Sequence, residues 1–137
     1  HKEYRRQRQM CIRDRPNTVY LAPGGAHMRI VPQAGGYVID IKVEENVSGH
    51  MPSADVLFQS FADNVPAKKS VGVILTGMGR DGAKGLKAMH DLGAQTIGQN
   101  EISCVVYGMP KAAKEIGAVD KEVNINEIAT NILYTCM

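Results

Sequence analysis

The sequence predicts an α/β fold, a partial doubly wound and mostly parallel sheet with an inserted antiparallel hairpin. The run VGVILT (71–76) is continuously apolar, as is typical of a strand buried on both faces of a parallel sheet. Strand-like and helical patterns alternate after it, which favours right-handed βαβ units. Earlier, HMRIVP (27–32) and YVIDIK (37–42) alternate with period 2 around QAGG, which predicts a hairpin with Gly35 and Gly36 in its turn.

The first half is predicted to begin with a short strand, VYLAP (19–23), which stops at a Pro-Gly-Gly turn. After the hairpin, residues 44–53 predict a loop. Pro52 and Ser53 then open a helix, because apolar side chains recur at helical spacing from Ala54 to Val65.

The second half is predicted to run strand, helix, strand, helix, strand, helix. Gly93 follows the first of these helices at a C-cap position. The expected ranges are a strand at 71–76, a helix at about 83–92, a strand at 95–99, a helix at 111–117, a strand at 119–125 and a closing helix from 126.

The length of 137 residues suits one domain, which we place at residues 17–137. Residues 1–16 form a basic tail that shows neither period 2 nor period 3.6 and is expected to be disordered or non-native. Six of the sixteen Lys and Arg residues lie in 1–15, which leaves ten basic residues against twelve acidic ones. The body therefore predicts no nucleic-acid partner.

Other totals exclude further classes of protein. No apolar run approaches the roughly 18–20 residues of a membrane span, so no membrane insertion is expected. Cys11, Cys104 and Cys136 are odd in number and far apart, which suits a reducing cytoplasm rather than a disulfide framework. The histidines lack ligand spacing, and we expect neither a metal nor a cofactor.

The segment TGMGRDGAKG (76–85) joins a predicted strand to a predicted helix and allows three interpretations. Its glycines fit the dinucleotide pattern G-x-G-x-x-G, and Glu101 falls where a ribose-binding acid belongs. Asp81 counts against that, because its charge would face a pyrophosphate. Asp81 could instead cap a helix through N–H groups of the first turn. It could also orient the histidine of a Ser-His-Asp hydrolase.

Four blocks resemble the catalytic domain of the CheB-type chemotaxis protein-glutamate methylesterases, over about residues 17–135. They are VYLAPGGAHM (19–28), GHMPSADVLFQSFA (49–62), LTGMGRDGAKGL (75–86) and QNEISCVVYGMPKAA (99–113). The resemblance implies a cytoplasmic serine hydrolase that demethylates glutamate methyl esters, and deamidates glutamines, on methyl-accepting chemotaxis receptors. It implies that Asp81 is the triad acid and that Met78 supports the oxyanion at the active site. It also implies an N-terminal receiver domain in the full-length protein.

The chain departs from that family in one respect. The family's Gly-Ala-Ser-Thr-Gly-Gly and Gln-His-Met-Pro type segments, which carry the triad serine and histidine, have no counterpart upstream of VYLAP, and no serine precedes Ser48. We therefore expect an N-terminally truncated domain that is inactive alone. The alternatives are a non-catalytic receptor-binding remnant and, less favoured, a dinucleotide-binding domain.

Several residues could be mistaken for the two missing triad members. His50 belongs to a His-Arg-Pro-Ser type block of the family, so it is expected to be structural or to line the site rather than to act as the base. The substitute nucleophiles to consider are Ser53, Ser60, Ser70, Ser103 and Cys104, none of which has a partner placed by the sequence.

Overall fold

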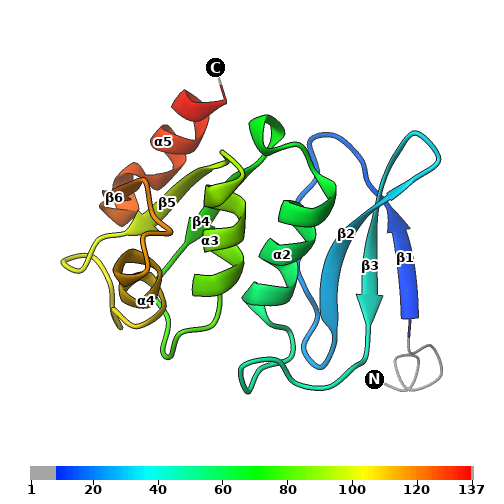
Figure 1. Cartoon of the computed structure of the whole chain (residues 1–137), viewed down its shortest axis with the longest axis horizontal. Helices are drawn as coiled ribbons and strands as arrows, with labels where there is room; N and C mark the ends of the chain where they lie inside the picture. Colours follow the sequence, from blue (N-terminus) through cyan, green and yellow to red (C-terminus); the bar gives the residue numbers. More distant parts are fainter. Residues whose placement is uncertain (1–8, 137) are drawn as a thin grey trace.

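The computed structural model describes residues 9–136 and contains two three-stranded sheets with helices between and around them (Figure 1). One sheet is antiparallel and the other is parallel. Helix α2 (Ala54–Asn64) lies between them, packed against the antiparallel sheet on one side and against helix α3 (Ala83–Asp91) on the other. The predicted α/β class is thereby confirmed.

The antiparallel sheet has the order β1 (Gln9–Arg13), β3 (Gly36–Lys42), β2 (His27–Gln33). The predicted hairpin is confirmed, but it belongs to this separate sheet and is not attached to the parallel one. Its two turn residues are Ala34 and Gly35, with φ of 44° and 80°, so Gly36 is already the first residue of β3. Positive φ at both positions is what a two-residue hairpin turn requires.

Two segments differ from the sequence-based expectation. Residues 9–13 form strand β1 on the edge of β3, although no periodicity marks them. Residues 1–8 lie outside the described residues, and whether 1–16 are native stays a prediction. The predicted strand VYLAP is wrong: residues 18–23 are irregular, with Val19 and Leu21 86% and 85% exposed. The residue types of this segment favour a strand, but among residues 9–136 no strand pairs with it.

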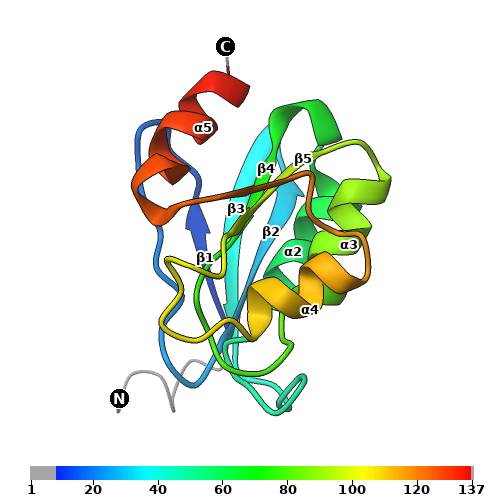
Figure 2. The same ribbon diagram turned by 90° about the vertical axis from the view of Figure 1, so that its left-hand side faces the viewer.

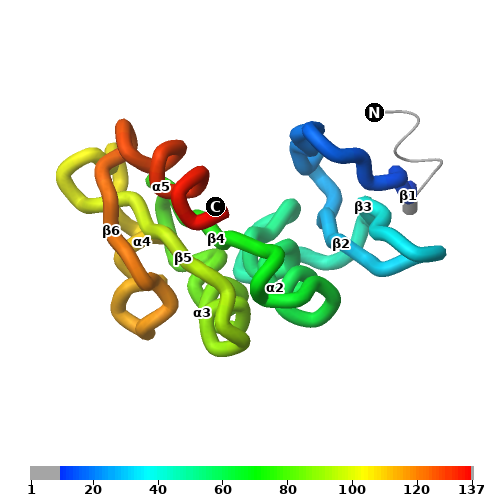
Figure 3. The backbone as a smooth tube through the Cα atoms, turned by 90° about the horizontal axis from the view of Figure 1, so that it is seen from above, coloured from blue at the N-terminus to red at the C-terminus, as the bar shows by residue number. Residues whose placement is uncertain are grey.

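The parallel sheet has the order β4 (Val71–Ile74), β5 (Gln95–Gln99), β6 (Lys121–Val123), as the βαβ pattern predicts. Helices α3 and α4 (Met109–Glu115) cover one face, and α5 (Ile128–Thr135) lies on the other (Figures 2 and 3). Short 3₁₀ turns at Ala67–Lys69 and Ile125–Glu127 precede β4 and α5. None of the helices within residues 9–136 has the length and apolar character needed to cross a bilayer.

The contact between α2 and α3 brings the two halves together. At Gly85 a Cβ atom would lie 2.8 Å from the Asp55 carbonyl oxygen and 2.8 Å from the Phe58 Cβ, so the two helices approach closely there. Buried side chains beside this contact form one core cluster, which includes Ile74 and Leu86. The close approach places the loop that precedes α3 against the start of α2.

Candidate functional site

The glycine-rich loop lies at the carboxyl end of β4, the end at which α/β sheets gather functional groups. Its first residues are hydrogen-bonded to the last residue of β5 and to the segment that follows it. The Thr76 N–H donates to Gln99 Oε1 at 2.7 Å, and the Gly77 N–H donates to the Val106 carbonyl at 3.1 Å. The Gly77 carbonyl in turn accepts from the Met109 N–H at 2.8 Å. The loop is therefore a rigid support for the residues after it.

Asp81 is 5% exposed, and both oxygens of its carboxylate accept hydrogen bonds from the first turn of α2. Oδ1 accepts from Ser53 Oγ at 2.6 Å and from the Asp55 N–H at 3.2 Å. Oδ2 accepts from the Ala54 N–H at 2.6 Å. A carboxylate oxygen can accept two such bonds, so Oδ2 keeps capacity for one more donor. An imidazole N–H is a donor of the right kind.

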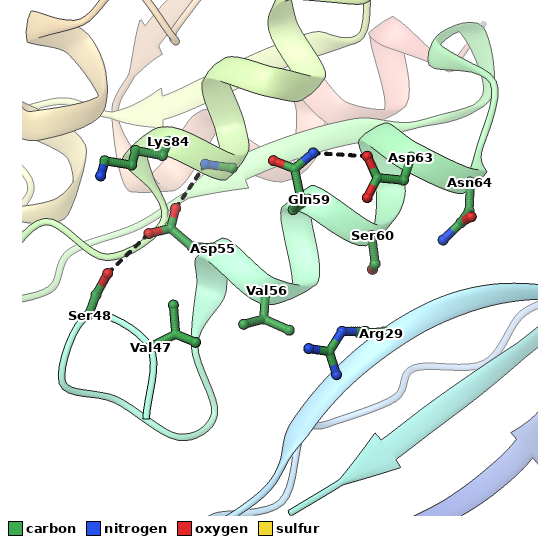
Figure 4. Close-up of a pocket in the computed structure, with 11 residues that line it drawn as sticks. Arg29, Val47, Ser48, Asp55, Val56, Gln59, Ser60, Asp63, Asn64 and Lys84 are labelled. Carbon is green, nitrogen blue, oxygen red and sulfur yellow. Dashed lines mark hydrogen bonds between the residues drawn. The ribbon is translucent and has the colours of Figure 1, made fainter. Parts of the chain in front are cut away.

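The helix-capping interpretation of Asp81 is correct in its chemistry, but the helix is not the one that follows in sequence. Asp81 caps α2, whereas α3 begins at Ala83 after Gly82 at the N-cap position, which has no side chain to cap it. The first turn of α3 is instead served by Asp55, whose Oδ1 accepts from the Gly85 N–H at 2.8 Å (Figure 4). Asp81 therefore caps α2, and Asp55, which lies in α2, caps α3.

Asp81 also lines a pocket of about 370 Å³ whose wall is mostly apolar. His50 lines the same pocket. Met78 does not line it and is 80% exposed. The pocket is formed by Ala22, Met28, His50, Pro52, Ser53, Ala54, Leu57, Asp81 and Met109.

A second pocket, of about 430 Å³, lies on the other side of α2 and does not include Asp81 (Figure 4). Its wall carries charges of both signs from Arg29, Lys84, Asp55 and Asp63. Arg29 is already paired with Glu44, and Asp63 accepts from Gln59 Nε2 at 2.9 Å. Because the first pocket contains the buried carboxylate of Asp81 and the second does not, the first pocket is the stronger candidate for a site.

Ser53, His27 and Asp81 lie together but are not connected as a catalytic triad. The Ser53 hydroxyl donates directly to Asp81, and the imidazole of His27 accepts from the Ser53 backbone N–H rather than from its hydroxyl. Ser53 is 2% exposed, and its hydroxyl is already bonded to Asp81. The hydroxyl of a catalytic serine must donate a hydrogen bond to the histidine base, and the Ser53 hydroxyl does not.

The other substitute nucleophiles are also held by local bonds. Ser60 and Ser70 donate to the Leu57 and Ala67 carbonyls. Ser103 bonds Asn100 within its own turn. Burial raises the pKa of the Cys104 thiol, which keeps it from the thiolate form that a nucleophile needs. In the part of the chain from 9 to 136, no group of three or more His, Cys, Asp or Glu side chains is arranged to hold a metal ion.

Comparison with known proteins identifies the family. A family model described as CheB methylesterase matches residues 7–132. The chain belongs to the CheB methylesterase family. It is 55% identical over 119 residues to protein-glutamate methylesterase/protein-glutamine glutaminase 1 of Caulobacter vibrioides, which is 86% of this chain and 34% of that protein. It is 54% identical over 110 residues to protein-glutamate methylesterase/protein-glutamine glutaminase 2 of Syntrophomonas wolfei, which is 80% of this chain and 32% of that protein.

The fold agrees with a solved member of the same family. The crystal structure of the Thermotoga maritima CheB methylesterase catalytic domain superposes with a TM-score of 0.80 at 30% sequence identity, over 84% of this chain and 60% of that chain. Our chain spans about a third of the length of the curated relatives it matches. The family match favours the hydrolase interpretation of the glycine-rich loop over the dinucleotide interpretation.

The supporting residues around Asp81 could not be found from the sequence. Pro52 and Ser53 predict where α2 begins, and this is confirmed, with Ser53 at the N-cap. Nothing in the local pattern links that cap to Asp81, which is 28 residues away, or to His27, which is 26 residues away. These contacts arise only when α2 packs against both the hairpin and α3.

Proposed function

We propose that this chain is the acid-bearing part of a protein-glutamate methylesterase that also acts as a protein-glutamine deamidase. Asp81 is the acid of its Ser-His-Asp triad. The observation that carries the proposal is a buried carboxylate that three donors from Ser53, Ala54 and Asp55 hold in place. Among residues 9–136, its Oδ2 accepts one hydrogen bond and has room for a second. The triad serine and histidine would come from a segment that these 137 residues do not contain.

In this role Asp81 does not react with the ester. It accepts the Nδ1–H of the triad histidine, which fixes the imidazole tautomer and stabilises the imidazolium that forms when the histidine takes the serine proton. The serine oxygen then attacks the glutamyl ester carbonyl, methanol leaves with the proton from the histidine, and water releases the glutamate. Deamidation follows the same steps with ammonia as the leaving group.

Met78 is proposed to assist through its backbone N–H, which would donate to the oxyanion of the tetrahedral intermediate. Met78 lies three residues before Asp81 on the same loop. Hydrogen bonds to residues 99–109 hold this loop in place. The Met78 side chain is exposed at the surface, where it could contact the substrate protein.

The substrates proposed are methyl-accepting chemotaxis receptors, and the location proposed is the cytoplasm. An N-terminal receiver domain is proposed for the full-length protein. These proposals rest on the family of the chain and on the activities for which its relatives are named.

The test uses a hybrid enzyme, defined as the full-length Caulobacter vibrioides relative in which the segment aligned with this chain is replaced by this chain's own residues. Membranes that carry receptors with radiolabelled glutamyl methyl esters serve as substrate, and released methanol is counted. We expect release at a rate comparable to that of the unmodified relative. A folded hybrid that binds the membranes without releasing methanol would identify a receptor-binding remnant and overturn the proposal.

A further inference from the structure

We propose that His27 is a positioning residue for Asp81: it fixes the first turn of α2, which in turn holds the carboxylate. This inference rests on the proposed function, because it assigns a role in the same reaction. His27 does not touch Asp81 and lies on β2, in the other sheet. Its influence would pass through Ser53.

His27 is fully buried, and both of its ring nitrogens are engaged. Nδ1 accepts from the Ser53 N–H at 3.2 Å, so this nitrogen carries no proton. Nε2 lies 2.8 Å from the Glu45 carbonyl oxygen and must be the donor to it. The two contacts therefore define one neutral tautomer and one ring orientation. A side chain constrained in this way can set the position of a backbone group.

A second bond ties the same two segments together. The Gly25 N–H donates to the Met51 carbonyl at 3.1 Å, two residues before Ser53. The segment from Gly25 to His27, at the entry to β2, therefore holds the residues just before α2 at two points, Met51 and Ser53. Of these two, only Ser53 makes a hydrogen bond to Asp81.

Ser53 and the peptide that follows it supply both of the short bonds to the carboxylate. Its hydroxyl donates to Asp81 Oδ1 at 2.6 Å, and the next N–H along the chain, that of Ala54, donates to Oδ2 at 2.6 Å. A rotation of the Ser53 peptide would therefore move both donors at once. In a triad a misplacement of about 1 Å can cost about 10²-fold in rate, so a small change at Ser53 is enough to matter.

The competing explanation is that His27 is only a satisfied polar residue in the core. The two ring nitrogens provide a way to separate the explanations. His27→Asn keeps an acceptor near the position of Nδ1 and so can still receive the Ser53 N–H. His27→Gln places its amide near Nε2 and so can still donate to Glu45, but leaves Ser53 without its acceptor. If His27 is only a core residue, the two substitutions should change kcat by similar factors. If His27 positions Ser53, His27→Gln should lower kcat much more than His27→Asn.

Ser60 provides the matched control. Its buried hydroxyl accepts from the Ile30 N–H at 3.0 Å and so also joins β2 to α2, but it makes no contact with Asp81. Ser60→Ala should therefore lower the melting temperature and leave kcat unchanged. This control separates the loss of a hydrogen bond between β2 and α2 from the loss of the bonds that position Asp81.

The experiment measures kcat, KM and melting temperature of the hybrid enzyme with labelled receptor membranes, with rates expressed per folded molecule. We expect His27→Gln to lower kcat by about 10–100-fold with little change in KM, and His27→Asn to recover most of that loss. Equal kcat losses in the two variants, or no loss in His27→Gln, would overturn the inference.

If His27→Gln fails to fold, Ser53→Ala tests the other half of the path, because it keeps the backbone N–H on His27 and removes the hydroxyl from Asp81. We expect it to lower kcat by about 10-fold or more, and an unchanged kcat would count against the path. Failure of the proposed function is distinguishable, since the hybrid with His27 intact would then release no methanol at all.

Discussion

Asp81 and Asp55 each cap the helix to which the other is adjacent. Asp81, just before α3, accepts the Ala54 and Asp55 N–H groups at the start of α2, and Asp55 accepts the Gly85 N–H in the first turn of α3. Each carboxylate also lies at the positive end of a helix dipole. The exchange fixes the two helix N-termini relative to one another. A structural role and a catalytic role for Asp81 are therefore compatible.

Loss of the cap on α3 should destabilise the protein. Asp55→Ala leaves the Gly85 N–H without its acceptor, and we expect the free energy of unfolding of the hybrid enzyme to fall by about 1 kcal/mol. Urea titration measures it. The control is Asp63→Ala, which loses one exposed bond from Gln59 and should change stability by less than about 0.5 kcal/mol. Equal effects would contradict the capping role.

The close approach of α2 and α3 should not tolerate a methyl group. In Gly85→Ala the new Cβ would lie 2.8 Å from backbone of Asp55, so the helices must separate. We expect a loss of about 1–3 kcal/mol in the free energy of unfolding. Gly24→Ala is the control, because a Cβ there meets nothing within 4 Å. A melting temperature of Gly85→Ala at or above that of Gly24→Ala would contradict the packing described.

Glu122 should contribute to the pH dependence of stability. The hydrogen bond from Lys114, and then that from Tyr107, lower the pKa of the Glu122 carboxyl. A lowered pKa stabilises the folded state fully above the unfolded pKa of about 4.3, and the contribution is lost as pH falls through the folded value. Glu122→Gln should therefore be less stable than the unsubstituted hybrid at pH 7, and the difference should shrink toward pH 3.

The control for this titration is Glu115→Gln, since the contact of Glu115 with Lys111 is exposed and 4.0 Å long. Surface pairs of this kind contribute little. Urea unfolding at pH 7, 5 and 3 measures all three proteins. A stability difference for Glu122→Gln that is constant across this range would show that the carboxylate is not linked to folding.

Met78 should act through its backbone rather than its side chain. Met78→Pro removes the N–H, and we expect kcat for methanol release to fall by about 10²–10³-fold. Met78→Ala keeps the N–H and should lose less than about 10-fold. Circular dichroism checks that both variants fold. Equal losses in the two would assign the effect to the side chain.

The local parts of this fold could be predicted from sequence and the tertiary contacts could not. The hairpin and the β4–α3–β5 unit follow from periodicity and turn residues over short spans. Strand β1 cannot be predicted from its own residues, because it forms by pairing with β3, a segment about 30 residues away in the sequence. VYLAP has the residue types of a strand, but these do not show whether another strand lies beside it to pair with. Asp81 could be selected as a site residue, but its cap on α2 depends on how α2 and α3 pack.

The most direct test of the central claim, that Asp81 is the triad acid, is the kcat of Asp81→Asn in the hybrid enzyme. Asparagine keeps one acceptor oxygen, but its NH2 group would face the Ala54 N–H where Oδ2 now accepts. We therefore expect the variant to fold with a lower melting temperature than the unsubstituted hybrid, and kcat is expressed per folded molecule. We predict a loss of about 10³–10⁴-fold in kcat with little change in KM, because the amide favours the wrong tautomer of the histidine. A folded Asp81→Asn variant whose kcat stays within about 10-fold of the unsubstituted hybrid would contradict the claim.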